Sequence, residues 1–347
     1  MAFEIIGTGC AVPPRRVTND ELAQTMDTSD EWIRSHTGIG TRYIAGEETA
    51  ASDLGLEAAR QALAMAAGLD TASADFEQAL AEAALSLDVI VLATVSPDFI
   101  ATPSTACVVQ DKLGAKRAAA LDITAGCTGF VYGMEVAAGL LSVSDGRKRA
   151  MVIGAETLTK LADWTDRGTA VLFGDGAGAV ILEKTESPST GAGRRGLIRT
   201  VLKADGSGGE HLICRRGGSR SPFKAGETIE KPSYIEMNGQ AVYNFAVKAI
   251  TETVPEILSL EGLNASDIAW IVPHQANARI IQAAAKRLKI PEEKFCLNME
   301  EYANTSAASI PIALDELYRG GKLAKGDLVI TMGFGGGLTY GAGLIVW

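Results

Sequence analysis

Cys127 is the residue of this sequence most suited to chemistry. It stands in LDITAGCTGF at 121–130, among small residues, after a run typical of a strand and before one typical of a helix. A thiol in the first turn of a helix feels the positive end of the helix dipole, an effect of ~0.3 to 2 kcal/mol that favours the thiolate. Lowering a thiol pKa by ~1.5 units takes about 2 kcal/mol, so the dipole has the required size. A lone cysteine is more often a small core residue, so its neighbours must decide.

Two other side chains and one glycine run have types that can take part in catalysis. His274 is one of three histidines and stands in IVPHQANARI, between a predicted strand and a predicted helix, where catalytic groups gather. Asn304 lies in YANTS, and the GFGGG run at 333–337 lets a backbone N–H approach a reacting carbonyl. Each alone has a structural alternative: a loop histidine, a turn or capping asparagine, a tight glycine turn.

The composition predicts a globular protein. The 347 residues, 47% of them hydrophobic, can bury a large core as one wide domain or two fused halves. No apolar run reaches the ~18 residues of a membrane-spanning helix, and the start MAFEIIGTG lacks signal-peptide features, so we expect a cytoplasmic protein without a membrane partner.

Cysteine usage and charge exclude several classes of protein. The five cysteines are scattered without CxxC spacing, which indicates neither a disulfide framework nor a zinc site, and we expect no metal. A formal charge of -10 disfavours a nucleic-acid partner, because such proteins usually carry a basic footprint.

Apolar runs and helical spacing predict an α/β order that occurs twice. Strands are expected at 3–6, 87–95, 118–123, 150–153 and 179–182, with helices at 52–68 and from Cys127 onward. In the second half we expect helices at 241–260 and 278–288, strands at 269–273 and 294–298, and a further strand in LVITMGFGGG. YANTSAAS then occupies the place that TAGCTGF holds in the first half.

The repeat predicts two duplicated halves, residues 1–186 and 187–347. The join is expected within 183–196, where serine, proline, glycine and charged residues mark a surface connection.

Taken together, the motifs resemble the thiolase superfamily, and most closely its β-ketoacyl-acyl carrier protein synthase III family. The resemblance runs nearly from end to end and rests on these motifs: DTSDEWI, TAGCTGF, TDRGT, FGDGAGA, PHQAN, ANTSAAS and GFGGGLTYG. It implies a five-layer αβαβα sandwich of two similar halves, in agreement with the repeat.

The resemblance also implies a mechanism. Cys127 would attack an acyl-CoA thioester, with the oxyanion held by the N–H groups of Cys127 and Gly336. His274 and Asn304 would then donate hydrogen bonds to the thioester oxygen of malonyl-acyl carrier protein while carbon dioxide leaves. No cofactor is implied, since the coenzyme A thioester is itself a substrate.

Further residues acquire expected roles from the family. Thr28, Trp32, Arg167 and Asn277 would bind coenzyme A, the adenine stacking on the indole and guanidinium faces. His36 stands where the family often has arginine, which weakens an expected phosphate contact.

The family also implies two protein contacts. Arg279, Lys286 and Arg287 form one basic face of a helix, for docking of the acidic carrier protein or as a merely solvated face, and a further family basic position is Asn244 here. A homodimer is implied, in which Thr102, Leu158 and Phe334 would gate the acyl pocket. A threonine at position 102 predicts room for longer primers, and the alternative is that Phe99, Ile100 or Leu158 refills the space.

The FGDGAGA motif and residues 70–86 need separate interpretations, and other functions remain as alternatives. FGDGAGA resembles a dinucleotide loop, but no acidic residue follows at the required spacing, so we reject NAD binding. Residues 70–86 are expected to form an extra surface helix. The alternatives are an acyltransferase or thioesterase of secondary metabolism on the same fold, or a non-catalytic acyl-thioester binder that would need no Cys-His-Asn set.

Overall fold

The computed structural model describes residues 1–186, 193–228 and 233–347. The elements up to residue 186 are, in chain order, β1 (Ala2–Ala11), β2 (Arg15–Thr18), α1 (Asn19–Leu22), α2 (Asp30–Thr37), β3 (Thr41–Ile44), α3 (Ala51–Ala67), α4 (Phe76–Ala84), β4 (Val89–Ala93), α5 (Thr105–Leu113), β5 (Ala119–Ile123), η1 (Gly126–Thr128), α6 (Gly129–Ser142), β6 (Arg149–Thr157), η2 (Leu158–Leu161), α7 (Arg167–Ala170) and β7 (Asp175–Thr185).

The remaining elements are β8 (Gly196–Ala204), η3 (Gly206–His211), β9 (Leu212–Cys214), β10 (Ile235–Met237), α8 (Gly239–Glu261), η4 (Ala265–Asp267), β11 (Trp270–Pro273), α9 (Ala278–Leu288), η5 (Glu292–Lys294), α10 (Met299–Tyr302), η6 (Ser306–Ala308), α11 (Ser309–Arg319), β12 (Leu328–Gly335) and β13 (Thr339–Val346). No described helix is both long and apolar enough to cross a lipid bilayer.

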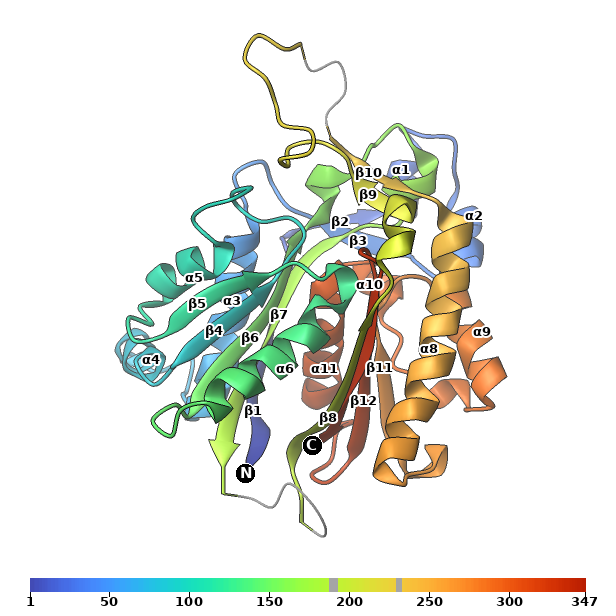
Figure 1. Cartoon of the computed structure of the whole chain (residues 1–347). Helices are drawn as coiled ribbons and strands as arrows, with labels where there is room; N and C mark the ends of the chain where they lie inside the picture. Colours follow the sequence, from blue (N-terminus) through green and yellow to red (C-terminus); the bar gives the residue numbers. More distant parts are fainter. Residues whose placement is uncertain (187–192, 229–232) are drawn as a thin grey trace.

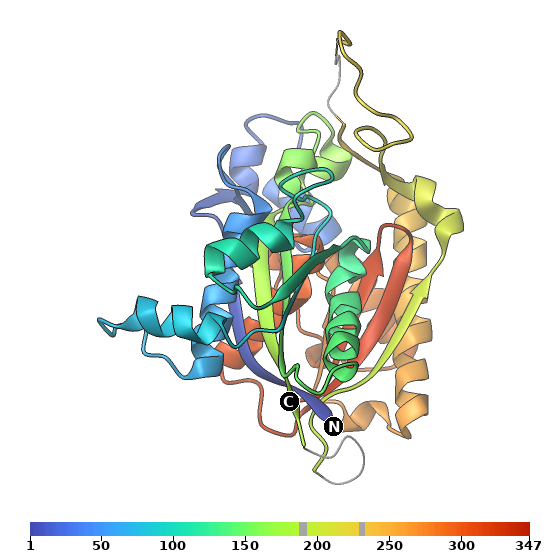
Figure 2. The same cartoon turned by 60° about the vertical axis from the view of Figure 1, so that its left-hand side comes forward.

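Two sheets and three helical layers confirm the expected αβαβα sandwich. Helices α3 and α5 cover the outer face of the five-stranded sheet, and α8 covers the outer face of the four-stranded sheet, with α9 packed against α8 (Figure 1). Helices α6 and α11 lie between the sheets and contact both, as the turned view in Figure 2 also shows. The α6 sequence is almost entirely apolar or small because both of its sides are buried.

Strand order confirms the duplication. The first sheet has the order β1-β7-β6-β4-β5 and the second β11-β12-β13-β8, with parallel pairing of β4 with β5 and β6, and of β11 with β12. In each half, the two remaining pairs are antiparallel. The strands on either side of the expected join, β7 and β8, belong to different sheets, and residues 187–192 of that join lie outside the described residues.

The prediction of a strand at 294–298 is wrong. Only Phe295 forms a β-bridge there, parallel to Ile271 and at the place that β5 holds in the first half. The Gln275 side chain takes over the role of a neighbouring strand: its amide donates to Cys296 O at 2.9 Å, and its oxygen accepts from Asn298 N at 3.0 Å. Side-chain bonds that satisfy the backbone remove the need for a ladder.

The extra segment at 70–86 contains a surface helix, as expected. Helix α4 buries Leu80 and Ala84 against α3, while most of its other side chains are at least partly exposed.

Candidate active site

The structure brings Cys127, His274 and Asn304 together around one cavity of about 250 Å³. Cys127 lies in η1, shortly after the end of β5, and His274 directly follows β11. Asn304 follows α10. Its segment is the second-half counterpart of the η1 region of the first half. Carboxyl ends of parallel strands from both halves therefore meet at this cavity, which is the usual location of sites in open α/β sheets.

Glycines allow the backbone to close around the thiol. Gly126 has φ +53, and a Cβ built on it would lie 2.5 Å from Gly336 O. A Cβ on Gly335 would lie 2.8 Å from Cys127 Sγ. The GFGGG run therefore serves close approach to Cys127, and the Gly336 N–H is near enough to lower the pKa of the thiol.

The expected lowering of the thiol pKa is wrong. Burial raises the pKa of Cys127 to about 11, and the negative charge of Glu156 acts in the same direction. Interactions with Ser306 and with the Gly336 N–H lower it, but less. The cysteine lies in the short 3-10 turn before α6 rather than in an α-helical first turn, and desolvation outweighs any dipole effect. The free protein holds a thiol here at neutral pH.

His274 is buried and neutral. Its Nδ1 lies 2.8 Å from Ser309 Oγ, and the Ser309 hydroxyl donates its proton to Ser306 O, also at 2.8 Å. Nδ1 therefore carries the ring proton, assigned from this network, and Nε2 is left as an acceptor. Burial lowers the pKa of His274 to about 3, and the ring of Phe334 packs against the imidazole edge to face at 5.3 Å.

Asn304 is fixed by its backbone and by its side-chain oxygen. Its N–H donates to Leu172 O at 2.9 Å, and its Oδ1 accepts the Ser306 N–H at 2.9 Å. Within the described residues its Nδ2 has no hydrogen-bond partner, although the side chain lines the cavity. The amide is thus oriented with a donor available to a ligand.

Two of the four expected coenzyme A residues stack on each other. The Arg167 guanidinium carbon lies 4.7 Å from the centroid of the Trp32 ring, and Arg167 Nη1 donates to Asp27 O at 2.7 Å. His36 also stacks on Trp32, with ring centroids 4.4 Å apart and planes at 22°, a contact that was not expected from the sequence. Both rings belong to α2, where histidines and tryptophans four positions apart share a face.

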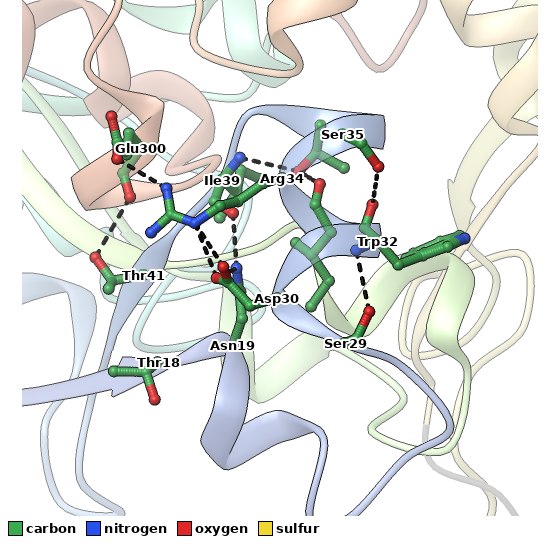
Figure 3. A network of polar contacts seen from close by, with 12 residues as sticks. Thr18, Asn19, Ser29, Asp30, Trp32, Arg34, Ser35, Ile39, Thr41 and Glu300 are labelled. Carbon is green, nitrogen blue, oxygen red and sulfur yellow. Dashed lines mark hydrogen bonds and ion pairs between the residues drawn. The ribbon is translucent and has the colours of Figure 1, made fainter.

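Polar contacts that do not involve the Trp32 ring hold helix α2 in place. Ser29 Oγ accepts from Trp32 N at its N-cap, and Arg34 forms ion pairs with Asp30 and Glu300 (Figure 3). This network fixes the helix that presents Trp32 to the cavity.

The other two expected coenzyme A residues differ in their surroundings. Thr28 Oγ1 is buried without a hydrogen-bond partner among the described residues and is not part of the cavity lining. Asn277 lines the cavity but uses its side chain structurally: Oδ1 accepts from Arg279 N as the N-cap of α9, and Nδ2 donates to His36 O at 3.0 Å.

The three expected gate residues do not lie together. Leu158 lines a second, largely apolar cavity of about 250 Å³ that also reaches Cys127, whereas Phe334 lines the first cavity beside His274. Thr102 is exposed on this chain and lines neither cavity. The second cavity has the following lining: Val95, Thr124, Ala125, Gly126, Cys127, Leu158, Leu161, Phe173, Leu212, Ile213, Cys214, Ile235, Ser306, Gly336, Gly337 and Thr339.

The expected basic face exists on α9. Arg279, Lys286 and Arg287 are exposed, and none pairs with an acidic side chain of the described ranges. Asn244 is exposed as well and accepts a hydrogen bond from Gln240.

Sequence reasoning missed three polar residues behind the site: Glu156, Ser306 and Ser309. Glu156 stands near the end of the otherwise mostly apolar run AMVIGAET, and a carboxylate inside a buried strand is a signal that could have singled it out. The two serines stand in the ANTSAAS motif, but only their contacts reveal their positions next to Cys127 and His274.

The fold and this site define a thiolase-fold condensing enzyme of the acyltransferase type. Family models described as 3-Oxoacyl-[acyl-carrier-protein (ACP)] synthase III and its C-terminal part match residues 121–206 and 258–347. The chain is 48% identical over 342 residues to the β-ketoacyl-[acyl-carrier-protein] synthase III of Clostridium perfringens strain SM101, covering 99% of this chain and 98% of that one.

Two further relatives match this chain over its whole length. The enzyme of the same name from Caldanaerobacter subterraneus subsp. tengcongensis is 46% identical, covering 100% of this chain and 98% of that one. The crystal structure of 3-oxoacyl-[acyl-carrier-protein] synthase III from Aquifex aeolicus VF5 superposes with a TM-score of 0.85 at 40% identity, covering 100% of both chains. The chain belongs to the β-ketoacyl-[acyl-carrier-protein] synthase III family.

Proposed function

We propose that this protein condenses an acyl-CoA primer with malonyl-acyl carrier protein by a decarboxylative Claisen reaction, and so initiates type II fatty-acid biosynthesis. The observation that carries the proposal is the shared cavity of Cys127, His274 and Asn304, because a thiol nucleophile and two polar side chains then face the same reacting carbonyl. Family membership supports the same reaction.

In the first half-reaction Cys127 attacks the acyl-CoA carbonyl and coenzyme A leaves. The N–H groups of Cys127 and Gly336 stabilise the oxyanion of the tetrahedral intermediate. The acyl chain enters the apolar cavity lined by Leu158, and the adenine binds at Trp32 and Arg167. Because these two side chains now stack on each other, Arg167 must leave the indole face before an adenine can be inserted.

In the second half-reaction the malonyl thioester oxygen accepts hydrogen bonds that hold the enolate. Asn304 Nδ2 is available for this as it stands. His274 donates from Nε2 only when the ring proton resides there, and Ser309 supports that tautomer by turning its hydroxyl from Ser306 O to Nδ1. The acyl-enzyme is then attacked by the carbanion, and Cys127 is released.

The remaining expectations complete the proposal. The reaction uses no metal or redox cofactor, the carrier protein docks on the basic face of α9, and the protein works in the cytoplasm as a homodimer whose partner chain brings Thr102 to the acyl pocket. The exposure of Thr102 on the single chain is compatible with a contact made between chains.

Intact-mass spectrometry and carbon dioxide release test the proposal. Cys127→Ala should gain no acyl mass with acyl-CoA, whereas His274→Ala and Asn304→Ala should still be acylated but release little labelled carbon dioxide from malonyl-acyl carrier protein. Acylation of Cys127→Ala would refute the nucleophile, and wild-type carbon dioxide release by both other variants would refute the enolate donors.

A further inference from the structure

Glu156 is a buried carboxylate that the proposed reaction leaves without a role. It lies near the end of β6 and is fully buried. Its oxygens accept hydrogen bonds from the segment after β4: Thr94 Oγ1 at 3.1 Å, Val95 N at 3.1 Å, Ser96 N at 3.2 Å and Ser96 Oγ at 2.6 Å. No cationic side chain of the described residues forms an ion pair with it. A buried carboxylate with donors but no cation is costly, and such groups gather at functional sites.

Ser306 lies between this carboxylate and the nucleophile. Its hydroxyl is near enough to both groups to lower the pKa of the Cys127 thiol and of the Glu156 carboxyl. The hydroxyl is buried and forms no hydrogen bond within the described structure, so it loses no partner when it turns toward either group. The Ser306 backbone has φ +47, a strained conformation for a non-glycine residue, which the surroundings must impose.

Two groups could take the Cys127 proton when the sulfur is acylated. Protonation of His274 would create a buried cation, and burial already lowers the pKa of its imidazole to about 3. Protonation of Glu156 would instead remove a buried anion, and burial raises the pKa of this carboxyl to about 7. The other carboxylate nearby in the sheet, Asp175 on β7, is directed to Thr159 and Ala45. Electrostatics therefore favour Glu156 as the acceptor.

We propose that Glu156 stores the Cys127 proton, through the Ser306 hydroxyl, for the lifetime of the acyl-enzyme. As the sulfur bonds to the acyl carbon, the S–H bond breaks, its proton passes to Ser306 Oγ, and the Ser306 proton passes to Glu156. The bond from the acyl carbon to the coenzyme A sulfur breaks, and the departing thiolate takes a proton from solvent.

The second half-reaction returns the proton. The enolate left by carbon dioxide attacks the acyl carbon, the bond to Cys127 Sγ breaks, and the sulfur regains its proton from Glu156 through Ser306. The site then holds a thiol and a carboxylate again. Because Glu156 is neutral in between, it does not repel the malonyl carboxylate or the enolate.

Difference infrared spectroscopy of the free and the acylated protein tests this inference, which rests on the proposed function. Acylation with acyl-CoA in the absence of malonyl-acyl carrier protein should produce the carbonyl stretch of a protonated carboxylic acid, which shifts in deuterium oxide, next to the thioester band. The carboxylic acid band should be absent in Glu156→Gln and present in Asp175→Asn, the control for a buried carboxylate whose hydrogen bonds go to Thr159 and Ala45 instead. A thioester band without the carboxylic acid band in the wild type would overturn the inference while leaving the proposed function intact. Absence of both bands would instead refute acyl-enzyme formation.

Acylation kinetics give an independent test. The wild-type rate should fall as the pH drops below about 7, because the acceptor must be ionised. Glu156→Gln and Ser306→Ala should acylate about 10²-fold more slowly at neutral pH, the usual size of a proton-transfer contribution, and their rates should follow only the ionisation of the thiol. A uniformly reduced rate with the wild-type pH profile would show a structural role. Faster acylation of Glu156→Gln would show that its charge only raises the thiol pKa; either result overturns the inference.

Discussion

The Nδ1 atom of His274 lies 2.8 Å from the Oγ of Ser309, and this hydroxyl in turn donates to the carbonyl of Ser306. The direction of the Ser309 hydroxyl proton therefore decides whether Nδ1 or Nε2 of His274 carries the ring proton, and so whether Nε2 can donate to a ligand. The relationship connects a residue of the second half's helix α11 with the histidine that follows β11.

Ser309→Ala should lower the rate of malonyl decarboxylation about fivefold, because one net hydrogen bond contributes about 1 kcal/mol. Acylation of Cys127 should be unaffected. Labelled carbon dioxide release and intact mass measure the two steps separately. Thr253→Val, which removes another buried hydroxyl, bonded to Ala249 O, is the control. Equal effects of both variants on decarboxylation would rule out a specific role of Ser309.

Trp32→Ala and Arg167→Ala should each raise the KM for acyl-CoA. Stacking and cation–π contacts contribute about 1 to 2 kcal/mol, so the expected increase is about 5- to 30-fold. Steady-state kinetics with saturating malonyl-acyl carrier protein measure it, and kcat should change little. Acylation by a short thioester that lacks the adenosine part should be equal in wild type and variants; a loss there as well would indicate a damaged site rather than lost adenine binding.

Alkylation of Cys127 by iodoacetamide should be slow at neutral pH and rise about tenfold per pH unit toward pH 11. The reason is that burial raises the pKa of the thiol to about 11 and only the thiolate reacts. Peptide mass spectrometry at different pH values distinguishes Cys127 from the exposed Cys107 and Cys214, which serve as internal controls. Fast, pH-independent alkylation of Cys127 between pH 6 and 8 would contradict the raised pKa.

Arg279→Glu and Lys286→Glu should raise the KM for malonyl-acyl carrier protein and flatten its salt dependence, because exposed charges chiefly steer association. The KM for acyl-CoA should not change. Lys116→Glu, an exposed lysine in the first half of the chain, controls for net charge. If all three variants behave alike, the face on α9 is only solvated.

Leu158→Ala should admit longer primers, since each additional buried methylene contributes about 0.8 kcal/mol and Leu158 lines the apolar cavity. Single-turnover acylation with straight-chain acyl-CoAs of increasing length measures the profile. Thr102→Phe should restrict the long substrates by overpacking only if a partner chain carries this residue to the pocket, because Thr102 lines neither of the two cavities at Cys127 on its own chain. An unchanged profile for Thr102→Phe would show that Thr102 is not the gate.

Much of the fold could be predicted from the sequence, because hydrophobic periodicity reports local structure. Helix α9 has the bounds expected from its pattern, and the two halves share a strand order as their repeated motifs predicted. The strand at 294–298 could not be excluded from its residues. Its Cys296 O and Asn298 N groups are satisfied by the side chain of Gln275, a partner some twenty residues away, and local propensity does not contain such contacts.

By itself, the sequence determined which residue types are present and next to which motifs they stand, and that was sufficient to single out Cys127, His274 and Asn304. Only the tertiary structure decided their protonation and surroundings. Burial is a property of the assembled layers, so the high thiol pKa of Cys127, the neutral ring of His274 and the closeness of Glu156 to Ser306 follow from packing between the two halves. The same holds for Asn277, whose amide is committed to capping α9 and to His36 O. Desolvation and long-range hydrogen bonds depend on where the chain returns in space, which residue order alone does not specify.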